Sequence, residues 1–135
     1  MMHIRPARAD EIERVREIER VSATRAADGE VAVAFVMFRP LEGCAYVEQI
    51  DVAPSHARRG IGGRLLEAVA GLARARGWPA LTLSTFKDVP FNAPYYARLG
   101  FEPVEHLTPG LAKIRAEHEA RGLDETARVF MQRKV

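Results

Sequence analysis

The chain has 135 residues, of which 47% are hydrophobic, 28% charged and 7% aromatic. This length is enough for one compact domain and too short for two, so we expect residues 1–135 to form a single domain. The 20 basic and 18 acidic residues leave a net charge of +2, without the clustered positive excess that is typical of nucleic-acid-binding proteins. We therefore expect no nucleic-acid partner.

Hydropathy and cysteine usage exclude further classes of protein. The N-terminal segment MMHIRPARADE lacks the apolar stretch of a secretory signal, and the longest apolar run, residues 31–38, is far shorter than a membrane span of about 20 residues. We expect a cytoplasmic protein with no membrane partner. The single cysteine, Cys44, excludes an intrachain disulfide and is expected to be a half-buried free thiol. The histidines lack the spacing of metal ligands, so no metal is expected: His3, His56, His106 and His118.

Strands and one helix are predicted in the first half of the chain. Asp10 begins a helix over residues 10–20, because Glu13 follows it in capping-box spacing and apolar residues recur at every third position. The segment EVAVAFVMF is apolar at both parities, which is typical of a strand that is covered on both faces. The predicted strands of this half span residues 3–7, 30–38 and 44–52.

Helices and strands alternate in the second half. The predicted helices span residues 61–76, 92–99 and 108–121, and the predicted strands span residues 80–86, 101–105 and 128–133. Asn92 and Thr108 are each followed by a proline within the first turn, so both are expected to be N-cap residues. Gly77 is placed to end the first of these helices. Strands interleaved with helices favour an α/β fold in which helices cover both faces of a sheet.

One segment carries a chemical signal. The predicted strand CAYVEQIDV is followed by the loop APSHARR and by GIGG, which opens the helix at residue 61. The start of a helix leaves backbone N–H groups without partners and carries partial positive charge, and glycines let a phosphate approach those donors closely. Arg58, Arg59 and Arg64 lie around this turn and can neutralise an anion. The segment therefore predicts a phosphate site.

The spacing excludes the two commonest phosphate ligands. A dinucleotide fingerprint needs a third glycine where this chain has Leu65. A Walker loop needs a G-K-[ST] sequence, which the chain lacks.

Two motifs together resemble a known family. RGIGG at residues 59–63 follows a strand that ends in VAP, and YYARLGF follows at residues 95–101. This combination resembles the GNAT superfamily of N-acetyltransferases, and the resemblance covers nearly the whole chain. It implies a twisted mixed sheet of about six strands with helices on both faces. It also implies that the two central strands, 44–52 and 80–86, splay apart.

The resemblance implies that acetyl-CoA is the acyl donor. In the family, backbone amides of the glycine-rich loop hold the pyrophosphate, the end of the preceding strand binds the pantetheine arm, and the thioester lies in the splay. Asn92 is expected to be an N-cap first and a contact of the coenzyme second. The cofactor-binding residues implied in this chain are Ile50, Asp51, Val52, Arg58, Arg59, Gly60, Ile61, Gly62, Gly63 and Asn92.

The resemblance also implies two catalytic residues. Glu48 matches the family's general base, which takes a proton from the acceptor amine. Asp51 is an alternative base, and the alternation of a regular strand would let only one of the two face the acetyl group. Tyr96 matches the tyrosine that protonates the departing sulfur, while Tyr95 is expected to be structural. The alternative, purely structural interpretations are that Glu48 is an exposed or ion-paired residue of the strand and that Tyr96 is an aromatic residue that packs in the core.

Two departures from the family pattern leave the acceptor side open. Ala57 stands where the family often has Gln or Arg. Members of the family usually carry two helices and a longer strand between the first strand and the segment that matches residues 30–38. Here only residues 23–29 separate the first predicted helix from that strand. The acceptor pocket is then unusually open, or it is completed by a second chain in a homodimer or by the helix at residues 108–121.

The function implied is acetyl transfer from acetyl-CoA to a primary amine of a small molecule or peptide, by direct attack in a ternary complex. The alternative is a non-catalytic acyl-CoA-binding module that senses the cofactor or regulates a partner.

Overall fold

One sheet of seven strands organises the chain in the order β1-β2-β3-β4-β5-β7-β6. The computed structural model describes residues 2–6, 22–28, 31–90 and 92–135. The strands are β1 (Met2–Pro6), β2 (Ser22–Asp28), β3 (Val31–Leu41), β4 (Cys44–Val52), β5 (Ala80–Phe86), β6 (Glu102–Pro103) and β7 (Arg128–Lys134). The helices are α1 (Ile61–Ala75), α2 (Ala93–Arg98) and α3 (Pro109–Ala120), with short 3-10 turns η2 (Pro54–His56) and η3 (Glu125–Ala127).

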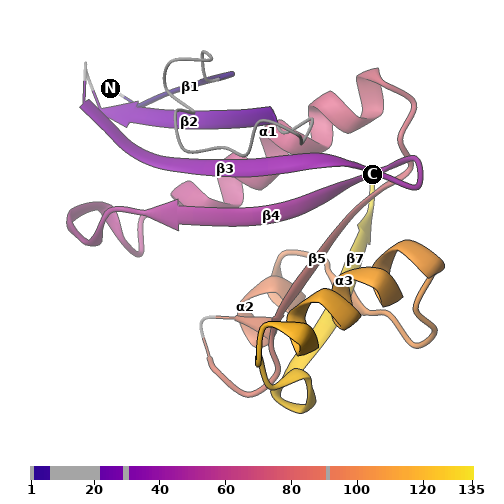
Figure 1. The fold of residues 1–135 in the computed structure, drawn as a ribbon. Helices are drawn as coiled ribbons and strands as arrows, with labels where there is room; N and C mark the ends of the chain where they lie inside the picture. Colours follow the sequence, from indigo (N-terminus) through magenta and orange to yellow (C-terminus); the bar gives the residue numbers. More distant parts are fainter. Residues whose placement is uncertain (1, 7–21, 29–30, 91) are drawn as a thin grey trace.

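The two central strands separate along their length. β4 and β5 are parallel, whereas every other strand pair in the sheet is antiparallel. They pair only at Ala45 with Leu81 and at Tyr46 with Thr82, near the start of both strands. Beyond these pairs the strands diverge, as Figure 1 shows. The predicted splay is therefore confirmed.

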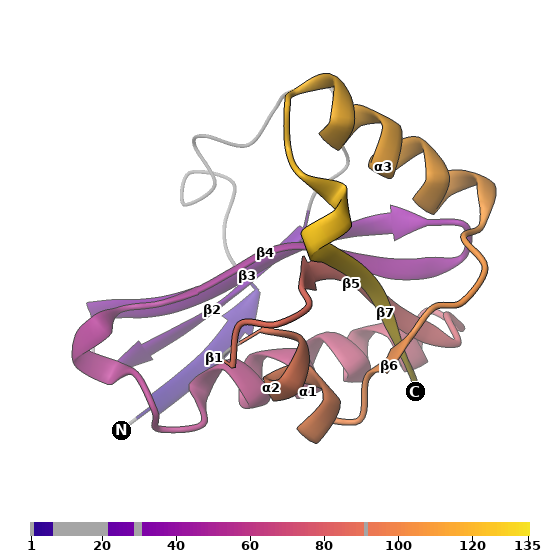
Figure 2. The same ribbon diagram turned by 90° about the horizontal axis from the view of Figure 1, so that it is seen from below.

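Helices cover both faces of the sheet, as predicted (Figure 2). On one face, α1 and α2 pack against the larger hydrophobic core, which includes Val36, Phe38 and Leu81 from the strands. On the other face, Leu111 and Ile114 of α3 pack against sheet side chains; with them, the buried members of this smaller core are Tyr46 and Phe130. The two faces are called below the α1 face and the α3 face.

Helix α1 forms where the sequence predicts it because its apolar residues recur every three or four positions. The buried residues of this helix are Ile61, Leu65, Leu66, Val69, Ala70 and Ala73. Gly77 follows the helix with a φ of 74°, the left-handed conformation that a glycine adopts at low cost. The helix predicted at residues 10–20 lies outside the described residues.

The structure adds one strand that the sequence did not predict and shortens another. Residues 22–28 form β2, which pairs with both β1 and β3, although their sequence SATRAAD lacks a strand-like alternation. The strand predicted at residues 101–105 shrinks to two residues, β6. Asn92 occupies the N-cap position of α2, as predicted, but its side chain makes no capping hydrogen bond.

Helix α3 is tied to the hairpin between β3 and β4. Thr108 caps the helix as predicted, because its hydroxyl accepts a hydrogen bond from the Leu111 N–H at 3.3 Å. Glu42, in the hairpin turn, accepts hydrogen bonds from the Thr108 hydroxyl and from the Gly110 N–H, the latter at 3.1 Å. These contacts hold the start of α3 over the sheet. None of the described helices is both long and apolar enough to cross a membrane.

Candidate functional site

The loop before α1 has the backbone geometry of an anion site. Arg58 and Gly60 have φ angles of 63° and 75°, and Gly60 is the N-cap of the helix. No side chain caps the helix, and its first turn holds no acidic residue. The first helical hydrogen bond runs from the Arg64 N–H to the Gly60 carbonyl at 3.1 Å. The N–H groups that precede it are therefore available to a ligand.

The glycines of this loop serve two different purposes. A Cβ atom on Gly60 would meet nothing within 4 Å, so Gly60 is needed for its left-handed backbone and leaves open space beside the loop. A Cβ atom on Gly62 would lie 3.2 Å from the Tyr95 hydroxyl, and one on Gly63 would lie 3.5 Å from Leu99. These two glycines let α2 pack closely on the first turn of α1. Only their backbone N–H groups remain for the phosphate role that the resemblance implies.

Basic side chains surround the helix start. Arg58, Arg59 and Arg64 are all exposed at this turn. Together with the dipole of a 15-residue helix they make the region favourable for a diphosphate.

The edge of β4 that faces β5 is open beyond the first two pairs. Within the described ranges, β4 pairs with β5 only through Ala45 and Tyr46. The Ile50 and Val52 side chains pack against the core on the α1 face. The backbone of this half of β4 therefore has one edge that an extended ligand can pair with, in the position predicted for residues 50–52.

A β-bulge at Glu48 changes which side chains share a face. Met37 pairs with Gln49 and Phe38 with Val47, so Glu48 is an extra residue in β4. Glu48 forms an ion pair with Arg39, whose guanidinium lies 5.5 Å from the centre of the Tyr46 ring on the α3 face.

Asp51 also lies on the α3 face. Its partner in β3 is Phe35, and the neighbouring pairs, Val36 with Ile50 and Ala34 with Val52, lie on the α1 face. Strict alternation along β4 was therefore the wrong premise, because the bulge puts Glu48 and Asp51 on the same face. Asp51 accepts a hydrogen bond from the Gln49 side chain at 2.6 Å.

Tyr96 is buried where α2 meets the core. Its side chain is 8% exposed, and its ring makes edge contacts with Tyr95 and Phe101 at centroid distances of 5.5 and 5.7 Å. Burial, with smaller contributions from Tyr95 and Asp51, raises the pKa of Tyr96 to about 12. Tyr96 therefore keeps its proton at neutral pH.

Cys44 is partly buried, as predicted, and burial raises the pKa of its thiol. It lies at the start of β4, at the opposite end of the strand from the bulge and the open edge. Among the described residues, no three His, Cys, Asp or Glu side chains group as a metal site.

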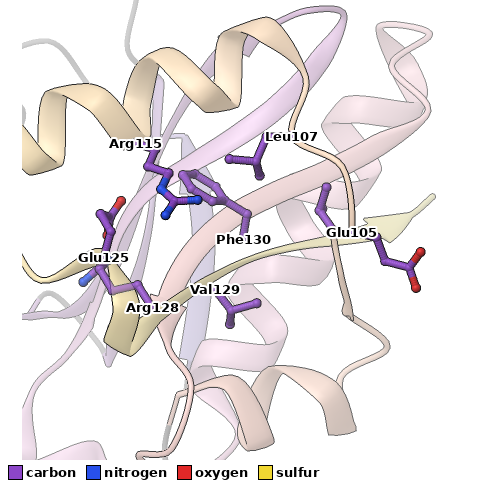
Figure 3. A pocket seen from close by; sticks show the side chains of 8 residues that line it. Glu105, Leu107, Arg115, Glu125, Arg128, Val129 and Phe130 are labelled. Atoms are coloured by element: carbon purple, nitrogen blue, oxygen red, sulfur yellow. The ribbon is translucent and has the colours of Figure 1, made fainter.

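Sequence reasoning missed a second polar cluster, on the α3 face. Glu125, in η3, is buried; it lies in hydrogen-bond contact with His118 of α3 and forms an ion pair with Arg128 of β7. It lines a cavity of about 150 Å³ between α3 and β7, which Figure 3 shows from close by. Only tertiary packing brings these residues together, and no motif in the sequence marks them.

Comparison with known proteins gives one family and a shared fold. Residues 3–101 match the model of the Acetyltransferase (GNAT) family. Nourseothricin acetyltransferase is 18% identical, with a TM-score of 0.72 and 98% of each chain covered. The ribosomal-protein-S18-alanine N-acetyltransferase from Escherichia coli is 18% identical, with a TM-score of 0.70, and the match covers 100% of this chain and 94% of that chain. The N-acetylglutamate synthase from Neisseria gonorrhoeae, complexed with coenzyme A and N-acetyl-glutamate, is 16% identical, with a TM-score of 0.75. This match covers 99% of this chain and 35% of that chain.

Proposed function

The chain belongs to the acetyltransferase (GNAT) family, and from this premise we propose that it transfers an acetyl group from acetyl-CoA to a primary amine of a small molecule or peptide. The observation that carries the proposal is the uncapped start of α1, which opens beside the free edge of β4. A diphosphate at the start of α1 and an extended arm along the edge of β4 together fit a single ligand of the coenzyme A type. The bound coenzyme A of the Neisseria gonorrhoeae relative supports this reading.

The chain offers a separate set of groups for each part of the donor. The N–H groups of residues 61–63, with Arg58, Arg59 and Arg64, would hold the diphosphate. The backbone of residues 50–52 would hold the pantetheine arm along the open edge of β4. When bound, acetyl-CoA supplies an acetyl group that is activated as a thioester.

Acceptor chemistry belongs on the α3 face, where the bulge places two carboxylates. A carboxylate there removes a proton from the acceptor ammonium, directly or through water, so that the nitrogen can form a bond to the acetyl carbon. Glu48 and Asp51 both meet this requirement of position. The ion pair with Arg39 holds the Glu48 side chain in place, whereas Asp51 is exposed and has a neutral partner, Gln49.

Tyr96 is the proposed proton donor to the sulfur when the carbon–sulfur bond breaks. A phenol with a pKa of about 12 is a weaker acid than a free thiol, whose pKa is near 8.5. Tyr96 therefore acts by holding a hydrogen bond to the departing sulfur, and the proton moves fully only if the site stabilises the phenolate or passes the proton onward.

The alternative is an acyl-CoA-binding module without turnover. The ion pair of Glu48 favours it, because a carboxylate held by Arg39 also fits a purely structural role. Tight binding of coenzyme A, together with no thiol release across a broad amine panel, would favour this alternative.

The direct test is free-thiol release from acetyl-CoA in the presence of an amine panel. Tyr96→Phe should lower the turnover rate by about tenfold or more, because it removes the hydrogen bond to the sulfur, and should leave the Kd for coenzyme A nearly unchanged. Tyr95→Phe is the matched control, since it removes a neighbouring hydroxyl from the same helix. Equal turnover in the wild type and in Tyr96→Phe would remove Tyr96 from the mechanism.

The proposal also covers partners and location. We place the enzyme in the cytoplasm, with no nucleic-acid partner. Helix α3 covers the part of the α3 face around Tyr46 and Phe130. The predicted homodimer remains a prediction, and light scattering on the purified protein tests it.

A further inference from the structure

The end of β5 presents an exposed aromatic ring on the α3 face. Leu81 and Leu83 of this strand pack in the core of the α1 face. Ser84 and Phe86 alternate with them, so their side chains lie on the α3 face. The guanidinium of Arg128 lies 4.9 Å from the centre of the Phe86 ring, and its Nε donates a hydrogen bond to the Ser84 hydroxyl at 3.2 Å. Phe86 nevertheless remains 44% exposed.

A second exposed apolar side chain follows Phe86. Among the residues that the structure describes, three large apolar side chains are exposed, and two of them, Phe86 and Val89, lie at this end of β5. A single exposed apolar residue needs no explanation, but two close together in the chain make an apolar surface that a ligand can cover.

Phe86 and Asp51 lie at the same height on the two diverging strands. The last pair that joins β4 to β5 is Tyr46 with Thr82. Phe86 is the fourth residue after Thr82. Asp51 is the fourth after Tyr46 once the extra residue, Glu48, is set aside. Both side chains lie on the α3 face, so an acidic residue and an apolar residue stand on either side of the splay.

Asp51 is the charge that an acceptor can pair with at the splay. Glu48 is already paired with Arg39. Asp51 is exposed and accepts a hydrogen bond from the neutral Gln49 amide at 2.6 Å. Within β4 and β5, all of whose residues the structure describes, Asp51 is therefore the charged side chain that has no partner of opposite charge.

Arg128 adds no free cation beside Phe86. Its Nε lies 3.4 Å from Oε2 of Glu125, and its terminal nitrogen donates a hydrogen bond to the Ser84 carbonyl at 3.3 Å. A carboxylate on the acceptor would have to compete with Glu125 for this guanidinium. The surroundings of Phe86 therefore favour an apolar group over an anion.

We propose that the acceptor is a primary amine with one positive charge and an apolar body. Its ammonium group pairs with Asp51, and its body packs against Phe86. A second charged group on the acceptor would lose water beside the ring without gaining a partner. This inference rests on the proposed acetyl transfer and names the class of amine that the same site accepts.

The test compares three amines with the same six-carbon chain, which are hexylamine, 6-aminohexanoate and 1,6-diaminohexane. They differ only in the far end, which is apolar, negative or positive. The kcat/KM for thiol release from acetyl-CoA should be at least about tenfold higher for hexylamine than for either of the others. An equal or higher value for 6-aminohexanoate or 1,6-diaminohexane would overturn the inference.

Two variants assign the preference to Phe86. Phe86→Ala should reduce the advantage of hexylamine to about threefold or less, mainly through a higher KM, because the apolar contact is lost. Trp78→Ala is the matched control, since the Trp78 ring also lies against an arginine, 5.0 Å from the guanidinium of Arg76, but precedes β5 at its opposite end. The readout is a ratio between amines, so a loss of folded protein leaves it unchanged. An undiminished advantage in Phe86→Ala would overturn the inference.

Calorimetry with the same three amines separates this inference from the proposed function. The protein is first saturated with coenzyme A, and the Kd of each amine is then measured without turnover. Tighter binding of hexylamine without thiol release from acetyl-CoA would support the amine class and contradict acetyl transfer. Thiol release at similar rates with all three amines would support acetyl transfer and contradict the amine class. Binding of none of the three would overturn the inference as well.

Discussion

Tyr46 and Tyr96 are both buried, one in the core of each face of the sheet. Burial raises the pKa of each tyrosine from 10.0 to about 12. For Tyr46, Arg39 and Arg128 oppose this rise, whereas Glu48 and Glu125 add to it. The Tyr46 hydroxyl thus lies in the field of both ion pairs of the α3 face.

These raised pKa values predict a loss of stability at alkaline pH. In the unfolded chain the tyrosines ionise near pH 10, while in the folded chain they stay neutral until about pH 12. The folded state therefore binds more protons in this window, and the free energy of unfolding falls as pH rises from 10 to 12. The slope is roughly 1.4 kcal/mol per pH unit for each tyrosine.

Urea unfolding at a series of pH values measures this slope. Tyr46→Phe should flatten it, and Tyr95→Phe serves as the control, because Tyr95 is less buried. An identical slope in the wild type and in Tyr46→Phe would contradict the prediction.

At the scale of elements, strong local sequence patterns were sufficient to predict the central helix and strands of the fold. The range of β4 and that of β5 match the predicted strands, and α1 differs by one residue at its end, because each has a clear apolar pattern with a defined stop. β2 could not be predicted in this way, since its strand state depends on pairing with β1 and β3 rather than on its own residues. The bulge at Glu48 also depends on pairing, which a single strand's sequence does not contain.

The candidate site was predictable to the same extent. The glycine-rich start of α1 is a local signal, so the helix begins at residue 61, where the sequence predicts it. The cavity beside α3 was not predictable, because Arg115, Glu125 and Phe130 come from three elements that meet only in the folded chain.

The cap of α3 gives a prediction for this element. Thr108→Ala removes the acceptor for the Leu111 N–H and the hydroxyl that binds Glu42, so it should lower the free energy of unfolding by about 1 kcal/mol. Amide exchange at Leu111 should become faster, which NMR can follow. Thr108→Ser keeps the hydroxyl and should retain most of the stability. A Thr108→Ser variant as unstable as Thr108→Ala would mean that the hydroxyl is not the cause.

At the scale of the whole molecule, binding at the start of α1 is linked to folding. A ligand at a hundred times its Kd stabilises the folded state by about 2.7 kcal/mol, so coenzyme A should raise the melting temperature. Gly60→Ala should lower stability by roughly 1 kcal/mol, because alanine is strained at a φ of 75°. The variant should also reduce the shift that coenzyme A produces, since the loop that presents the N–H groups is disturbed.

Gly71→Ala is the matched control for this prediction. Gly71 lies within α1, and a Cβ atom there would meet nothing within 4 Å. Alanine at this position should stabilise the helix by up to about 1 kcal/mol and leave the coenzyme A shift unchanged. A full coenzyme A shift in Gly60→Ala would indicate that the ligand binds without this loop.

The extra residue in β4 has a consequence for the architecture around it. A chain that lacked Glu48 would pair residue for residue with β3, and the other side chains of β4 would keep their faces, because the bulge is absorbed at that single position. The core side chains of such a chain would pack equally well, but β4 would be straighter and would diverge less from β5. The extra residue is thus not needed for core packing. Its effect is to help keep β4 and β5 apart.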